Sequence, residues 1–202
     1  FGAHTLSEQP VGVDAAKRVV AALDFDRLTA EVIELVKIPS VSGTPGEVRV
    51  QEWYSKALAE AGLTVDQWDL DLAGLAAHPD FPGVEVHRER AIGCVGTTGE
   101  GPAGLILQGH TDVVPVQREF WEDEPFAGHI KDGEIWGRGA LDMKGLGVAQ
   151  LMTFLTVKRL GIPLKRDLVF FAMADEEAGS EWGIRWLERN HPDTLDAEFV
   201  IN

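Results

Sequence analysis

Residues 168–177 read LVFFAMADEE. The seven apolar residues at 168–174 are too few for a fully buried helix, and they are typical of a strand covered on both faces. Asp175, Glu176 and Glu177 follow this run without a polar spacer. Open α/β sheets keep their sites at the carboxyl ends of strands. The stretch therefore predicts a central strand with carboxylates at the functional edge of a sheet.

A second buried strand is predicted at 105–107, and the segment GHTDVVP (109–115) follows it. In an extended chain, His110 and Asp112 would point to the same side. A metal-bound histidine commonly donates its second ring N–H to a carboxylate, and Asp112 is placed for that task. A capping aspartate beside a surface histidine has the same spacing. Taken alone, this motif leaves both interpretations open.

The segment GRGALDMKG (137–145) precedes a long apolar helix predicted from Met143 to Leu160. Asp142 stands at the head of that helix, where the helix dipole favours a carboxylate. Its two oxygens could bridge two cations, and a simple N-cap aspartate would explain the position equally well.

The acidic triplet also allows two interpretations. It could be a solvated loop, but adjacent residues in an extended chain point in opposite directions. Glu176 and Glu177 would then have different tasks, one binding metal and the other facing the substrate as a base. Two cations roughly 3.5–4 Å apart, held by these segments together, would activate a water for attack on a carbonyl.

The remaining pattern alternates helices with strands, which predicts a layered α/β fold with a largely parallel sheet. In the first half, the expected elements are a helical run capped by Asp14, a helix with Leu28, Val32, Leu35 and Val36 on one face, a helix from Val50 to Ala61, a strand at 63–70, a loop at 73–83 and a strand pair or bent strand at 84–97. Further along, we expect a hairpin at 120–137, a helix at 180–190 and a strand at 199–201. Ser180 would cap the helix at 180–190, and Trp182 and Trp186 would lie on one of its faces.

Composition narrows the class of protein. The 202 residues, 45% of them apolar, suffice for one sizeable domain. The net charge of −15 argues against nucleic acid and against anionic membranes as partners. A single cysteine, Cys94, excludes an internal disulfide and fits a reducing compartment. With no long apolar run and no signal-peptide pattern, we expect a cytoplasmic protein.

Other hydrolytic chemistries lack their motifs. The sequence has no Gly-x-Ser-x-Gly elbow, no His-Glu-x-x-His and no phosphate-binding loop with Gly-Lys-Ser/Thr.

The motifs as a set resemble the M20 metallopeptidases, which include aminoacylase, carboxypeptidase S and succinyl-diaminopimelate desuccinylase. The resemblance covers about residues 32–202, with the blocks in matching order. It rests on IPSVSG (38–43), GHTDVVP (109–115), Trp121 with Pro125-Phe126, GRGALDMKG (137–145) and DEEAGS (175–180). It implies a layered α/β/α fold of the co-catalytic zinc exopeptidase type.

The resemblance also implies a role for each site residue. His110 would bind one zinc ion, Asp142 would bridge two, and Glu177 would bind the other. Glu176 would act as general acid and base, and Asp112 would orient His110. The peptide bond after Asp142 would be cis. Co²⁺ or Mn²⁺ would suit the same donors.

The family has a further acidic ligand just after the strand at 199–201, and a histidine ligand beyond an inserted lid domain that often dimerises. If Glu198 lies in that strand, neither ligand is in this chain. We therefore expect residues 1–202 to be the N-terminal portion of a catalytic domain and to be inactive in isolation. A homodimer through a lid outside this chain is possible on the same basis.

The expected reaction is hydrolysis of an amide bond in small N-acyl amino acids or short peptides. The alternatives are a non-catalytic homologue that serves as a binding or scaffold domain, and a two-metal phosphoesterase. Trp121, Trp136 and Phe126 could line an entrance, although packing explains them as well.

Overall fold

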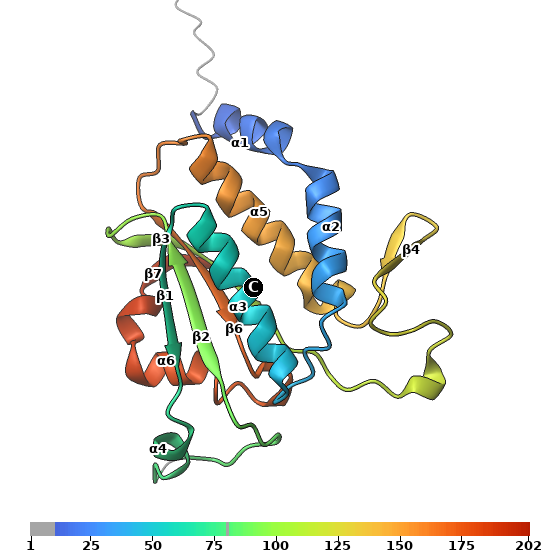
Figure 1. Ribbon diagram of the computed structural model, residues 1–202. Helices are drawn as coiled ribbons and strands as arrows, with labels where there is room; N and C mark the ends of the chain where they lie inside the picture. Colours follow the sequence, from blue (N-terminus) through green and yellow to red (C-terminus); the bar gives the residue numbers. More distant parts are fainter. Residues whose placement is uncertain (1–10, 80) are drawn as a thin grey trace, which may run out of the picture.

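The computed structural model describes residues 11–79 and 81–202 (Figure 1). Its elements are, in chain order, α1 (Val11–Ala22), α2 (Phe25–Val36), α3 (Pro45–Glu60), β1 (Thr64–Asp69), α4 (Leu72–Ala76), β2 (Ile92–Thr97), β3 (Ala103–His110), η1 (Arg118–Phe120), β4 (His129–Lys131), β5 (Glu134–Trp136), η2 (Ala140–Lys144), α5 (Gly145–Arg159), β6 (Asp167–Met173), η3 (Glu176–Ala178), α6 (Ile184–Asn190), η4 (Pro192–Leu195) and β7 (Ala197–Ile201).

A five-stranded sheet forms the centre, in the order β1-β2-β6-β3-β7. β3 pairs in parallel with β6 and with β7, whereas β2 pairs antiparallel with β1 and with β6. Crossovers through α5 and α6 join the parallel strands, while only the short α4 lies between β1 and β2. The layered α/β fold with a mixed sheet is confirmed. Two of its four pairings are antiparallel, so the sheet is less parallel than the sequence predicts.

Both faces of the sheet are covered, as the apolar run in β6 predicts. Phe170 and Ala172 pack in one cluster with α2, α3 and α5. Phe171 and Met173 point to the other face, where they pack with Leu187 of α6. Burying an aromatic or aliphatic side chain of this size stabilises the fold by about 1.5–3 kcal/mol. This double burial makes β6 and its neighbour β3 a firm base for the residues at their carboxyl ends.

The helix ends follow local chemistry. Asp24 caps α2, and its carboxylate accepts a hydrogen bond from the N–H of Arg27 at 2.9 Å. α3 starts at Pro45 and ends before Gly62, whose φ of +70° suits a helix stop. Asp14 lies inside the first turn of α1, so its predicted role as the N-cap is wrong.

Two predictions between residues 73 and 97 are wrong. The expected loop at 73–83 contains the end of α4, which starts because the carboxylate of Asp71 accepts the N–H of Gly74 at 3.0 Å. The expected strand pair at 84–97 is reduced to β2, which begins at Ile92. The irregular segment before β2 carries the buried Arg88 inward, which breaks the alternation of a strand.

Two helices start later than predicted. α5 begins at Gly145 because the chain first makes the η2 turn, in which Asp142 and Met143 have non-helical dihedrals. α6 begins at Ile184, since Ser180 has a φ of +65° and cannot cap it. Trp182 is buried ahead of α6 rather than on its surface.

The helix predicted from Val50 starts earlier, at Pro45, and the remaining predicted helices and strands are confirmed. β4 and β5 form the expected hairpin, and the positive φ values at its turn, 54° at Asp132 and 83° at Gly133, match a turn whose twist suits a hairpin. β7 is the last strand, and Glu198 lies within it. Across the described residues, every helix is too short or too polar to cross a membrane.

Candidate metal centre

His110 is the last residue of β3, where pairing with β6 fixes its main chain. Its buried ring places Nδ1 3.0 Å from the backbone carbonyl oxygen of Asp112 and 3.6 Å from its carboxylate. If the neutral ring carries its hydrogen on Nδ1, this N–H donates to the carbonyl, and Nε2 has the free lone pair. Nε2 is therefore the nitrogen that can bind a cation.

Asp142 reaches the site from the η2 turn, whose backbone leaves the helical region at that residue. The turn starts at Gly139, with a φ of +83°, and a Cβ there would lie only 2.7 Å from Val113. The peptide bond between Asp142 and Met143 is cis, as the resemblance implies. The carboxylate of Asp142 is 73% exposed, so one side of the site is open.

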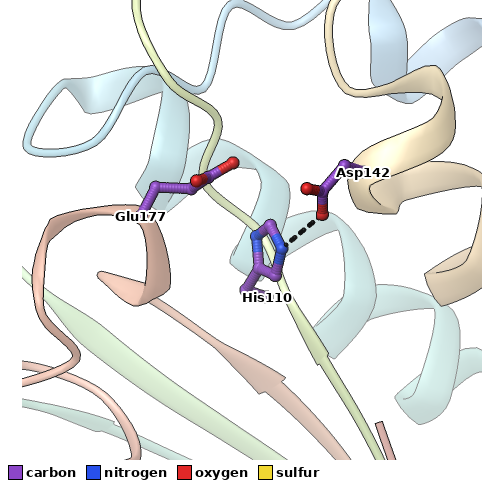
Figure 2. A group of neighbouring side chains, drawn as sticks. All are labelled: His110, Asp142 and Glu177. Carbon is purple, nitrogen blue, oxygen red and sulfur yellow. Dashed lines mark hydrogen bonds and ion pairs between the residues drawn. The ribbon is translucent and has the colours of Figure 1, made fainter.

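The structure brings three of the predicted residues together (Figure 2). The ligand atoms of His110, Asp142 and Glu177 lie within 4.8 Å of one another. Nε2 of His110 is 2.9 Å from Oδ1 of Asp142. They come from the end of β3, from the η2 turn and from the η3 turn, which are distant in sequence. One imidazole and two carboxylates fit a transition-metal cation such as Zn²⁺.

Glu176 lies beside this group and is half-exposed. Its Oε2 is 3.9 Å from Nε2 of His110, beyond hydrogen-bond distance but within reach of a shared water. The two glutamates are on the η3 turn rather than on an extended chain. Both carboxylates lie near His110, so the expectation that adjacent glutamates point in opposite directions is wrong, because the chain turns here instead of staying extended.

Asp112 lies completely buried beneath the site. One carboxylate oxygen accepts the hydroxyl of Ser42 at 2.7 Å and the N–H of Glu177 at 3.1 Å. The other accepts the N–H of Glu176 at 3.2 Å. Asp112 therefore touches both the histidine and the turn that carries the two glutamates.

Charge near His110 governs protonation of the site. Burial lowers the pKa of His110, but the carboxylates of Asp112 and Asp142 outweigh burial and raise it to about 9. Burial also raises the pKa of Asp112, and hydrogen bonds from His110 and Ser42 reverse this and hold it below its usual range. Burial is the main cause that raises the pKa of Glu177. A bound cation would favour neutral imidazole and ionised carboxylates, so it would replace the proton on His110.

A comparison with known families agrees with this geometry. Residues 106–202, which contain every site residue described so far except Ser42, match the model of Peptidase family M20/M25/M40. The chain belongs to the M20 peptidase family.

The sequence relatives of this M20 chain carry several names. A succinyl-diaminopimelate desuccinylase of Stenotrophomonas maltophilia is 40% identical over 162 residues, which are 77% of this chain and 36% of the relative. An N-formyl-4-amino-5-aminomethyl-2-methylpyrimidine deformylase of Halalkalibacterium halodurans is 33% identical over 177 residues, 87% of this chain and 38% of the relative. The chain thus spans a little over a third of the length of these curated relatives.

Solved structures share the fold of the M20 chain. Human carnosine dipeptidase 1 matches with a TM-score of 0.69 and 21% identity, over 91% of this chain and 40% of that one. An M20 family metallo-carboxypeptidase from Sulfolobus solfataricus matches with a TM-score of 0.66 and 22% identity, over 87% and 37%.

Sequence reasoning missed four residues that support the M20 site. Lys144 is buried, and its ammonium group donates to the carbonyl oxygens of Leu35 at 2.9 Å and Ile38 at 2.7 Å, which anchors the η2 turn. Its place in the GRGALDMKG block was the available signal. The other three are Ser42, Glu47 and Arg88, which are all buried, and Arg88 stands in a segment without any motif.

Aromatic residues of the hairpin region line a cavity that includes none of the metal-centre residues. Trp121 and Trp136 line a cavity of about 280 Å³ beside the hairpin. The guanidinium of Arg138 lies 5.3 Å from the ring centre of Trp121, and the ammonium of Lys131 lies 5.3 Å from that of Trp136. These cation–π contacts support packing as the main role of both rings.

Proposed function

We propose that the complete protein containing this chain is a two-metal hydrolase. It would cleave an amide bond in small N-acyl amino acids or short peptides. The observation that carries the proposal is the convergence of His110, Asp142 and Glu177 within 4.8 Å, with Glu176 beside them. The names of the relatives agree in kind, since they include desuccinylases, a deformylase, a dipeptidase and a carboxypeptidase.

We propose His110, Asp142 and Glu177 as the residues that hold the metal, with Asp142 bridging two ions. Bound cations would polarise the substrate carbonyl and lower the pKa of a water toward about 7. Glu176 would take the proton from the attacking water and pass it to the leaving nitrogen. Its half-exposed carboxylate, 3.9 Å from His110, supports this role. Asp112 would keep Nδ1 of His110 protonated through its backbone carbonyl oxygen, 3.0 Å away, so that Nε2 faces the site.

We further propose that residues 1–202 form the N-terminal portion of the catalytic domain. Glu198 lies in β7, and its carboxylate pairs with Arg166 at 2.9 Å, away from a ligand role. The remaining metal ligands would then lie after Asn202, as would a lid that could dimerise. On its own, the chain would bind metal weakly and turn over little substrate.

The decisive experiment is Glu176→Gln in the complete protein. We expect metal content near wild type and a fall in kcat of about 10²–10⁴-fold, because only the proton-transfer group is lost. Glu188→Gln, at an exposed position of α6, is the matched control. Elemental analysis measures the metal, and hydrolysis of N-acyl amino acids and dipeptides measures turnover. Unchanged kcat would remove Glu176 from the mechanism.

Two other outcomes decide between the alternatives. Faster cleavage of phosphate esters than of amides would favour a phosphoesterase. A protein without metal and without turnover on either class of substrate would favour a scaffold homologue.

A further inference from the structure

Three successive backbone N–H groups at the start of the glutamate turn donate to buried carboxylates from elsewhere in the chain. The N–H of Asp175 donates to Oε1 of Glu47 at 2.8 Å. The N–H groups of Glu176 and Glu177 donate to the two oxygens of Asp112 at 3.2 and 3.1 Å. The turn that presents Glu176 and Glu177 is therefore held on two carboxylates, of which only Asp112 belongs to the metal centre described above.

The second carboxylate, Glu47, is in the first turn of α3 and is 1% exposed. Its Oε2 accepts the N–H of Gly43 at 3.0 Å and also faces the guanidinium of Arg88 at 3.0 Å. Arg88 is 4% exposed, and its other terminal nitrogen contacts the carboxylate of Asp175. That carboxylate also accepts the N–H of Trp182 at 3.0 Å.

In this network, each carboxylate oxygen of Glu47 and Asp175 has at least one donor. Both residues are buried with every oxygen hydrogen-bonded, whereas Glu176 is half-exposed beside the metal centre. The planar fork of an arginine can satisfy two carboxylates at fixed angles, whereas a lysine ammonium cannot. Arg88 joins the irregular segment before β2, the start of α3 and the end of β6.

We propose that Arg88 is a positioning residue for the metal centre. By bridging Glu47 and Asp175, it sets the η3 turn so that Glu176 and Glu177 face His110 and Asp142. This inference rests on the proposed function for its effect on turnover, but its effect on the turn and on metal affinity does not depend on the substrate.

The test is Arg88→Lys in the complete protein, which keeps the charge and removes the fork. Arg90→Lys is the matched control, because Arg90 is two residues away and also bridges two carboxylates, Glu52 and Asp69, but at the surface. Affinity is measured by Co²⁺ titration at a temperature where each variant is fully folded. Hydrogen exchange is measured on peptides covering residues 174–182 in the metal-free state.

We expect Arg88→Lys to weaken Co²⁺ binding about 10–100-fold, the usual effect of losing a group that orients metal ligands. Amide exchange at 175–177 should also become faster. Arg90→Lys should change affinity less than twofold. If Arg88→Lys does not fold, Glu47→Gln removes the same bridge and is expected to give the same two effects.

A folded Arg88→Lys protein with wild-type Co²⁺ affinity and wild-type exchange at 175–177 would overturn the inference and leave Arg88 as a stabilising ion pair. Failure of the proposed function looks different. In that case, the wild-type protein itself would bind no metal or cleave no amide, while the exchange experiment would still report on the turn.

Discussion

Two groups of carboxylates meet at one edge of the sheet and differ in how many hydrogen bonds they accept. Glu47, Asp112 and Asp175 are at most 1% exposed, and backbone N–H groups and buried side chains occupy their oxygens. By contrast, Asp142 and Glu176 have side chains 73% and 49% exposed. Both groups consist of aspartate and glutamate. The donors around each oxygen therefore decide which carboxylates hold the backbone and which can take a cation or a proton.

The largest effect should be the difference in unfolding free energy between an Asp→Asn substitution in the buried group and one in the exposed group. Asp112→Asn replaces a buried carboxylate that accepts the N–H groups of Glu176 and Glu177 and the hydroxyl of Ser42. We therefore expect a loss of about 3–5 kcal/mol of unfolding free energy. Asp142→Asn should stay within about 0.5 kcal/mol, because the side chain is exposed, while metal binding falls. Urea unfolding of metal-free proteins measures both. Equal losses would erase the distinction between the groups.

The second-largest effect should come from substituting Lys144. This buried residue anchors the η2 turn, which carries the exposed carboxylate of Asp142. Lys144→Met leaves the carbonyl oxygens of Leu35 and Ile38 without this donor. We expect a loss of about 2–3 kcal/mol together with weaker metal binding. Lys158→Met, near the end of α5, is the control. A stable variant that still binds metal normally would show that Asp142 needs no such anchor.

The stability of the metal-free protein should depend on pH through His110, which contacts Asp112 of the buried group and Asp142 of the exposed group. The pKa of His110 is raised to about 9, above its unfolded value of about 6.5. Its protonated form thus stabilises the metal-free fold fully below about pH 6.5, and this contribution is lost as pH rises through 9. We expect a loss on the order of 3 kcal/mol, since each pKa unit corresponds to about 1.4 kcal/mol.

The measurement is urea unfolding with a chelator at pH 6 and at pH 9.5, taken as the difference between wild type and His110→Gln. Saturating Zn²⁺ should abolish the trend, because the metal replaces the proton. A difference that does not change with pH would mean that His110 is not charged in the metal-free protein.

The smallest effect should be the stability change in Glu176→Gln and Glu177→Gln. Their side chains carry the chemistry, but their backbone N–H groups carry the structure through Asp112. Substituting the side chains alone should change the unfolding free energy by less than about 0.5 kcal/mol. A larger loss in the metal-free state would place these glutamates with the buried group.

Local patterns were sufficient to predict much of the scaffold. The apolar run at 168–174 predicts β6, and GHTDVVP and GRGALDMKG mark the ends of the elements that present His110 and Asp142. The same patterns failed at 84–91, because Arg88 turns inward there toward partners far along the chain. Hydrophobic periodicity and residue propensity depend only on residues that are near one another in the sequence.

The sequence by itself determined the layered α/β class, the two buried strands and the residue types of a metal centre, because apolar period and motif spacing are local properties of the chain. Only the tertiary structure decided that Asp175, the first residue of the acidic triplet, is buried on Arg88, while the next two lie beside His110 at the metal centre. The physical reason is that a carboxylate's role depends on the donors that folding brings to it, and here these come from residues 42, 43, 88, 175 and 182.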